Sequence, residues 1–156
     1  MEAETQSYAL RQPTCSKVFT LGDQDNERDY NVTTDFNQTD PTHPRGHKGM
    51  DFSAPLGTSV NIQFQGTVTS SGPATGFGNA VAVAKRIDVA PGIPFTVSYA
   101  FGHGPSARGL TSGQGVFPGD QIMSVGSMGH STGPHLHVQK STGDPFTGKM
   151  QRPCVP

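Results

Sequence analysis

Two short segments of the chain combine residue types that bind metal ions. His47 and Asp51 lie four residues apart, and His135 and His137 lie on either side of one leucine. In a β-strand, residues i and i+2 point to the same face, so both imidazoles project together while the leucine turns into the core. Histidine nitrogen and carboxylate oxygen suit Zn²⁺, and a catalytic zinc site keeps one position open beside three protein ligands. Each pair occurs by chance in many proteins, but together with His103 they predict a catalytic metal site.

A zinc ion at such a site acidifies water and polarises a carbonyl group, which is the chemistry of amide hydrolysis. Many metalloproteases take their general base from the glutamate of an H-E-x-x-H motif. That motif is absent from this sequence, so a histidine has to supply the base. A neutral imidazole accepts a proton near neutral pH, and a protonated one donates to an oxyanion or a leaving amine.

Short alternating segments separated by turns surround these residues. Val60, Ile62 and Phe64 alternate with polar residues before a turn at Gly66, and Val68 continues beyond it, which indicates a β-hairpin. Further alternating segments cover residues 81–83, 95–99, 116–125 and 136–139, with turns at 76–79 (G-F-G-N) and 118–119 (P-G). No apolar stripe with a period of 3.6 residues is long enough for a helix. The sequence therefore predicts an all-β fold built on antiparallel sheet.

The composition is that of one turn-rich, folded domain. The chain has 156 residues, including 20 Gly and 13 Pro, and this length corresponds to a single core. Nine Phe and the alternating Val and Ile supply apolar surface to bury. The net charge of −1 gives no long-range attraction to nucleic acid. No window resembles a membrane span of roughly 20 apolar residues, and the first residues lack the basic and apolar regions of a signal peptide.

The first 46 residues carry few periodic signals. Residues 17–21 alternate well enough for one short strand. Acidic residues at positions 23, 25 and 27 have the alternate spacing of a calcium loop, but Arg28 occupies its glycine position and Thr34 that of its closing glutamate. A solvated loop is the favoured interpretation of this stretch.

The two cysteines, Cys15 and Cys154, lie near opposite ends of the chain. A disulfide between them would tie the ends together and imply an oxidising destination. Two reduced, buried thiols are the alternative. The residue types do not decide between the two, whereas a mass shift on alkylation without reductant would.

The site residues fall within motifs that resemble those of the lysostaphin-type zinc endopeptidases, metallopeptidase family twenty-three, which cut peptides in bacterial cell walls. The resemblance covers residues 46–139. Residues 47–58 read H-K-G-M-D-F-S-A-P-L-G-T and are similar to the family pattern H-x-G-x-D-x-x-A-P-x-G-T. The later blocks keep the family order: G-F-G-N at 76–79, F-G-H at 101–103, V-F-P-G-D-Q-I at 116–122 and S-T-G-P-H-L-H at 131–137.

This resemblance implies a role for each of the five site residues. His47, Asp51 and His137 would hold one zinc ion, and His103 and His135 would form the catalytic pair, with the division of roles between them left open. The implied fold is a twisted antiparallel sheet with a groove floored by the zinc.

The resemblance also implies how the chain is organised and what it acts on. Residues 1–156 would form a single peptidase domain, with an N-terminal strand and loop segment (1–46), a catalytic core (47–139) and a C-terminal tail (140–156). The implied activity is zinc-dependent hydrolysis of amide bonds in the peptide stems or cross-bridges of peptidoglycan, in an extracellular or cell-envelope location. The loops at 23–46 and 104–114, which would select the bond, match the family least.

Two other hypotheses compete with or extend the hypothesis of a peptidoglycan peptidase. A phage or prophage protein carried on a virion or tail, and a bacterial enzyme exported with a leader, are both compatible with the sequence. A non-catalytic module of the same fold, which binds and activates other wall hydrolases or is a structural phage component, is the alternative to an enzyme. Such modules typically lose ligands, and here all the expected ligands are present.

Several neighbouring residues receive structural interpretations. His43 and His130 match no family ligand and are expected at the surface. Gly49 is expected to permit backbone geometry beside the ligands. Gly104 replaces the usual leucine after the histidine, so the local groove shape is expected to differ from that of the family. Met123 replaces a smaller residue, which is expected to alter packing beneath the last strand.

Overall fold

The computed structural model describes residues 12–22, 30–105, 109–129 and 131–156. Across these ranges the chain forms β-strands and one 3-10 helix, Cys15–Lys17, and it contains no α-helix. Among the described residues, therefore, no helix has the length and apolarity needed to cross a membrane. The prediction of an all-β fold is confirmed. The acidic positions 23, 25 and 27, for which a solvated loop is predicted, lie outside the described residues.

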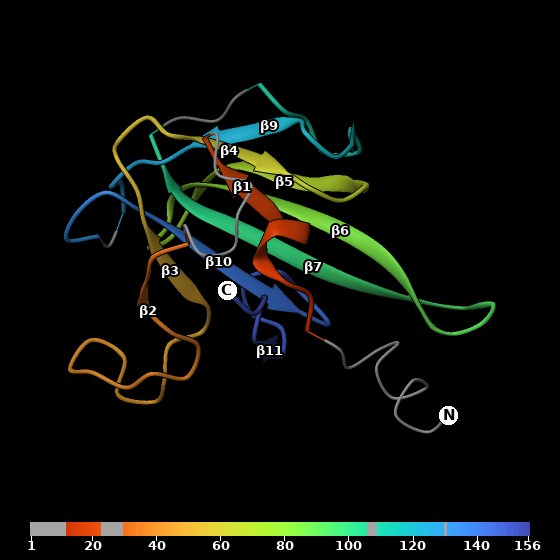
Figure 1. The fold of residues 1–156 in the computed structure, drawn as a ribbon, viewed down its shortest axis with the longest axis horizontal. Coiled ribbons are helices and arrows are strands. Elements are labelled where there is room, and N and C mark those ends of the chain that lie inside the picture. Colours follow the sequence, from red (N-terminus) through yellow and green to blue (C-terminus); the bar gives the residue numbers. More distant parts are fainter. Residues whose placement is uncertain (1–11, 23–29, 106–108, 130) are drawn as a thin grey trace.

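The strands form two antiparallel sheets (Figure 1). The smaller has the order β1-β4-β9, and the larger has the order β2-β3-β10-β7-β6-β5-β8, with β11 also paired to β10. The strands are β1 (Phe19–Leu21), β2 (Val32–Thr34), β3 (Met50–Ser53), β4 (Ser59–Ile62), β5 (Gly66–Ala74), β6 (Gly78–Ala90), β7 (Ile93–Gly104), β8 (Gly115–Val116), β9 (Gln121–Ser124), β10 (His135–Ser141) and β11 (Met150–Gln151).

The core lies between the two sheets and combines aliphatic side chains with a cluster of aromatic rings. The ring of Phe19 on β1 packs edge-on against Phe52 on β3, 5.0 Å away, and against Phe101 on β7, 6.2 Å away. All three side chains are fully buried, as is Leu136 on β10. Burying large rings of this kind gives a domain most of its hydrophobic stabilisation. The small sheet thus packs against one face of β3, β7 and β10. The opposite face of these strands carries the site residues.

One predicted turn is confirmed and one predicted hairpin is wrong. The G-F-G-N segment joins β5 to β6, with positive φ angles at Gly76 (83°) and Gly78 (64°), as a tight turn requires. In contrast, β4 does not pair with β5; it pairs with β1 and β9. Gly66 is not a turn residue but the first residue of β5. A Cβ there would lie 2.7 Å from the carbonyl oxygen of Ala84, so glycine allows β5 to approach β6 closely.

The chain ends are tied together by a disulfide between Cys15 and Cys154, which decides between the two alternatives left open by the sequence. Both cysteines are fully buried. Nearby, the backbone N–H of Cys15 donates to the carbonyl of Val155 at 2.9 Å. The last residues also contribute β11, whose Gln151 pairs with Lys140 of β10. Residues 140–156 are therefore packed onto the sheet.

The disulfide closes a long loop, since its cysteines are 139 residues apart. We expect the double variant Cys15→Ala, Cys154→Ala to lose roughly 3–5 kcal/mol of unfolding free energy, because the crosslink restricts the unfolded chain. Urea unfolding followed by circular dichroism measures this loss, with reduced wild type as the matched control. Equal unfolding midpoints for the oxidised wild type and the double variant would show that the crosslink does not stabilise the fold.

Candidate metal centre

Three adjacent strands bring the predicted site residues together. His137 on β10 pairs with Asp51 on β3 on one side and with Gly102 on β7 on the other. Residues paired across an antiparallel sheet point to the same face, so the carboxylate and the imidazole meet directly. His47 lies in the segment just before β3, and His135 is the first residue of β10. The prediction that His135 and His137 share one face, with Leu136 buried on the other, is confirmed.

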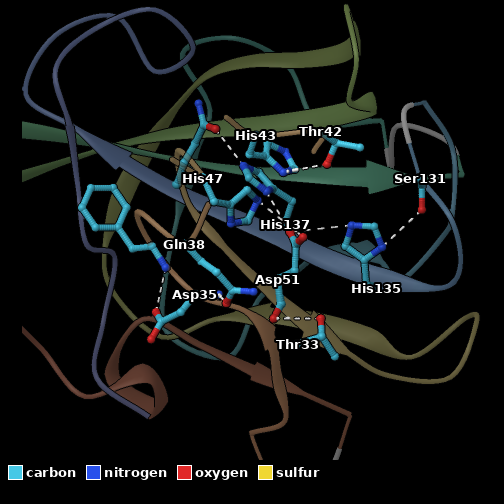
Figure 2. A network of polar contacts seen from close by, with 12 residues as sticks. Thr33, Asp35, Gln38, Thr42, His43, His47, Asp51, Ser131, His135 and His137 are labelled. Carbon is cyan, nitrogen blue, oxygen red and sulfur yellow. Dashed lines mark hydrogen bonds and ion pairs between the residues drawn. The ribbon is translucent and has the colours of Figure 1, made fainter. Parts of the chain in front are cut away.

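The donor atoms of His47, Asp51 and His137 converge (Figure 2). Nδ1 of His137 lies 2.9 Å from Oδ1 of Asp51, and Nε2 of His47 lies 3.4 Å from Oδ2 of the same carboxylate. One ligand atom from each residue lies within 4.8 Å of the other two. Donors on a single tetrahedral ion with bonds of about 2.0–2.2 Å are separated by roughly 3.3–3.6 Å, which is close to these spacings. The group can therefore hold a metal ion.

The charges of this group suit a cation. Burial opposes ionisation of Asp51, but a hydrogen bond from His137 and the charges of His137, His47 and His135 outweigh it, so the pKa of Asp51 lies below its ordinary value. Burial lowers the pKa of His47, because a charged imidazole is poorly solvated there. An ionised carboxylate and a neutral imidazole are the forms that bind metals.

His103 reaches the site because the backbone of β7 is irregular. Strand alternation from Gly102, which pairs with His137, would send His103 to the opposite face. Between the pairs Asn79↔Gly104 and Val81↔Phe101, however, β7 has one more residue than β6, which is a β-bulge. His103 also has φ 70°, a left-handed value that few non-glycine residues adopt. As a result its ring lies 4.5 Å from that of His135 and 6.0 Å from that of His137.

The hydrogen bonds of His103 fix which ring nitrogen carries the proton. Its Nδ1 lies 2.6 Å from the carbonyl oxygen of Met128. A carbonyl oxygen can only accept, so Nδ1 donates and Nε2 of the neutral ring is left as an acceptor. Burial lowers the pKa of His103 to about 4, with His135 and His137 nearby adding to the effect. His103 is therefore a neutral proton acceptor at neutral pH.

His135 is held in the same way on the other side of the group. Its Nδ1 lies 2.8 Å from the carbonyl oxygen of Gly133 and 3.2 Å from the hydroxyl of Ser131. Its Nε2 lies 3.7 Å from Oδ1 of Asp51. The two histidines of the predicted catalytic pair thus direct Nδ1 toward backbone carbonyls.

Two departures from the family pattern compensate each other, and one glycine is required by packing. A Cβ at Gly104 would lie 2.6 Å from the terminal methyl group of Met123, so the larger methionine fills the space beside the smaller glycine.

At Gly49, a Cβ would lie 2.2 Å from the carbonyl oxygen of Val138 and 3.0 Å from Cε1 of His137. Glycine there lets the segment between His47 and Asp51 lie directly on β10, as predicted.

His43 lies at the surface, as predicted, with a side chain that is 33% exposed. Its ring is half-buried, lies 4.7 Å from the ring of His47 and lines the same groove. The carboxylate of Asp40 accepts the backbone N–H groups of Thr42 and His43, and it lies 3.2 Å from Nδ1 of His43. This turn, built around an aspartate, folds His43 inward, a signal that the sequence D-P-T-H carries. His130, also predicted at the surface, lies outside the described residues.

The groove over the metal group has a volume of about 600 Å³. Its lining includes the five predicted site residues and Phe77, a residue that the sequence indicated only as part of a turn. The ring of Phe77 stacks on His103 at 6.1 Å and lies 5.4 Å from the ring of His137. It therefore contacts both a predicted ligand and a predicted catalytic residue.

The fold is that of the lysostaphin-like peptidase domains, and the site is a group of side chains that could hold a metal ion. The catalytic domain of lysostaphin from Staphylococcus simulans superposes with a TM-score of 0.64, covering 79% of this chain and 90% of its own at 23% identity. The catalytic domain of EnpA, a prophage-encoded M23 protein from Enterococcus faecalis, superposes with a TM-score of 0.62, covering 80% and 89% at 29% identity. Residues 45–147 match the model of peptidase family M23. The chain belongs to that family.

The chain also matches a small part of a longer curated relative. The DD-carboxypeptidase/endopeptidase Mpg of Neisseria meningitidis serogroup B is 36% identical over 96 residues, which make up 61% of this chain and 20% of Mpg. This chain thus spans about a fifth of the length of that relative.

Proposed function

We propose that this chain is a zinc-dependent endopeptidase that hydrolyses amide bonds in the peptide stems or cross-bridges of bacterial peptidoglycan. The observation that carries this proposal is the convergence of His47, Asp51 and His137, with His103 and His135 beside them. Membership of peptidase family M23 and the resemblance to lysostaphin support the same reaction class.

His47, Asp51 and His137 would hold the zinc ion, because their nitrogen and oxygen donors are those that zinc prefers and their spacing fits one ion. Bound zinc supplies Lewis acidity, which polarises the scissile carbonyl and acidifies water. The chain itself supplies the polar groups that move protons and orient the substrate peptide.

His103 and His135 would accept and donate the protons in this reaction. His103 is neutral at neutral pH, and its Nε2 is the acceptor that takes the proton from the attacking water. His135, held by Gly133 and Ser131, would donate to the oxyanion or to the leaving amine once it carries a second proton. The division of roles that the sequence left open is thus proposed from the surroundings of the two rings.

The competing hypothesis, a non-catalytic module that activates other hydrolases, gains no support from the site. All five site residues are present, and they surround a groove of about 600 Å³ that can admit a peptide. The buried disulfide fits an oxidising compartment and therefore an extracellular or cell-envelope location.

Digestion of purified peptidoglycan tests this proposal directly. Cell-wall fragments from Gram-positive and Gram-negative sources are incubated with the zinc-loaded protein and analysed by mass spectrometry. We expect new peptide amino termini in at least one source, and the fragment masses identify the bond that is cut. Intact fragments from every source, with zinc bound to the protein, would favour the non-catalytic module.

A further inference from the structure

Gln139 is a buried residue beside the metal group, and its side chain has no role in the proposed reaction. It follows His137 by two residues on β10 and therefore lies on the same face of the strand. Its side chain is fully buried, and its Oε1 lies 2.8 Å from Nε2 of His137. On the other side of the ring, Nδ1 of His137 donates to the carboxylate of Asp51, and a metal ion bound there would take the place of that proton. Each ring nitrogen of His137 thus has one defined partner.

The orientation of the Gln139 amide follows from its second contact. Its Nε2 lies 2.8 Å from the carbonyl oxygen of Pro145. A carbonyl oxygen can only accept, so the amide group that faces Pro145 has to be the NH₂. The oxygen of the amide therefore faces His137, and because this oxygen also only accepts, Nε2 of His137 has to carry a proton.

We propose that Gln139 is a positioning residue that holds a proton on Nε2 of His137, so that the metal ion takes the place of the proton on Nδ1, the nitrogen beside Asp51. This inference rests on the proposed function in one respect, the assignment of His137 as a ligand. Metal-binding histidines generally donate their second N–H to an acceptor that fixes the tautomer and the ring orientation. Here an uncharged amide, buried and anchored at its far end, provides that acceptor.

The anchor is the loop that follows β10, residues 142–149, which we call the support loop. The hydroxyl of Ser141 donates to the carbonyl oxygens of Gly143 and Asp144 and fixes the start of this loop. Later in the loop, the ring of Phe146 lies 5.4 Å from Phe77, which in turn contacts His137. The support loop therefore braces the metal group through the Gln139 amide and through the rings of Phe146 and Phe77.

Zinc affinity distinguishes a positioning role from a merely structural one. We expect Gln139→Met, which removes the acceptor at similar volume, to weaken zinc binding by about 10–100-fold in competition with a chelator. Gln139→Glu keeps an acceptor oxygen toward His137 but loses the N–H that donates to Pro145, and it should recover most of that loss in zinc affinity. The matched control is Ile62→Val, which removes one buried methylene from β4 in the smaller sheet and leaves Gln139 and the support loop unchanged. This control should lower the thermal unfolding temperature and keep the zinc affinity of the wild type.

The proton itself can be observed by ¹⁵N-detected nuclear magnetic resonance of the wild type, both metal-free and zinc-loaded. We expect a slowly exchanging proton on Nε2 of His137 in both forms and faster exchange in Gln139→Met. An unprotonated Nε2 in the wild type, or undiminished zinc affinity in Gln139→Met, would overturn the inference. Failure of the wild type to bind zinc would instead contradict the proposed function, and the metal-free spectrum would still test the position of the proton.

Discussion

The variants Asp51→Ala and His137→Ala are expected to lose bound zinc and cell-wall hydrolysis together. Each removes one of three donors from the group and leaves the other two too few to hold the ion. Without the ion, transition-state stabilisation of several kcal/mol is lost, which corresponds to a rate at least ~10³-fold lower. Zinc content by atomic emission and release of peptide fragments from cell walls measure the two losses on the same samples.

A neighbouring histidine provides the matched control for these variants. His43→Ala removes an imidazole that lies 4.7 Å from the ring of His47 but is outside the converging group. This variant should keep zinc at one ion per chain, and its hydrolysis should fall far less than that of the two ligand variants. Circular dichroism should show that all three variants are folded. Full hydrolysis by folded Asp51→Ala would refute the ligand assignment.

His103→Ala is expected to separate binding from catalysis, because this residue lies beside the metal group and is not one of its three donors. We expect zinc to remain bound and turnover to fall by at least about 10²-fold, the usual effect of losing a positioned acid–base group. Measurement of kcat and zinc content on the same preparation tests both parts.

The backbone at position 103 calls for a second variant. Its φ of 70° is unfavourable for alanine, so part of any loss in His103→Ala could come from the bulge rather than from the imidazole. Asparagine tolerates this conformation, and His103→Asn should therefore stay folded and show the same loss of turnover. Turnover close to that of the wild type in His103→Asn would exclude the imidazole of His103 as the proton acceptor.

The predictions from strand alternation and turn motifs are correct where the local backbone is regular. Alternation along residues 135–139 is enough to place His135 and His137 on one face, because no bulge interrupts β10 between them. The G-F-G-N turn is predictable because its glycines adopt the positive φ angles that such a turn needs. Spacing and family resemblance predict five site residues, and these five side chains line one groove.

The rest depends on contacts between distant residues. The partners of β4 are β1 and β9, which no alternating pattern can reveal, and the hairpin predicted at Gly66 was wrong for that reason. His103 enters the site only through a bulge that is set by its pairing with β6. Gln139 looks like an ordinary strand residue, and its role becomes visible only when Pro145 is seen to orient its amide.

The central claim is that two imidazoles and one carboxylate from distant parts of the chain hold a single zinc ion. A crystal structure of the zinc-loaded protein, with anomalous diffraction at the zinc edge, tests it most directly. We predict one strong anomalous peak within about 2.0–2.2 Å of a ring nitrogen of His47, a carboxylate oxygen of Asp51 and Nδ1 of His137. A peak on other residues, or none at this group in a crystal grown with zinc, would contradict the account.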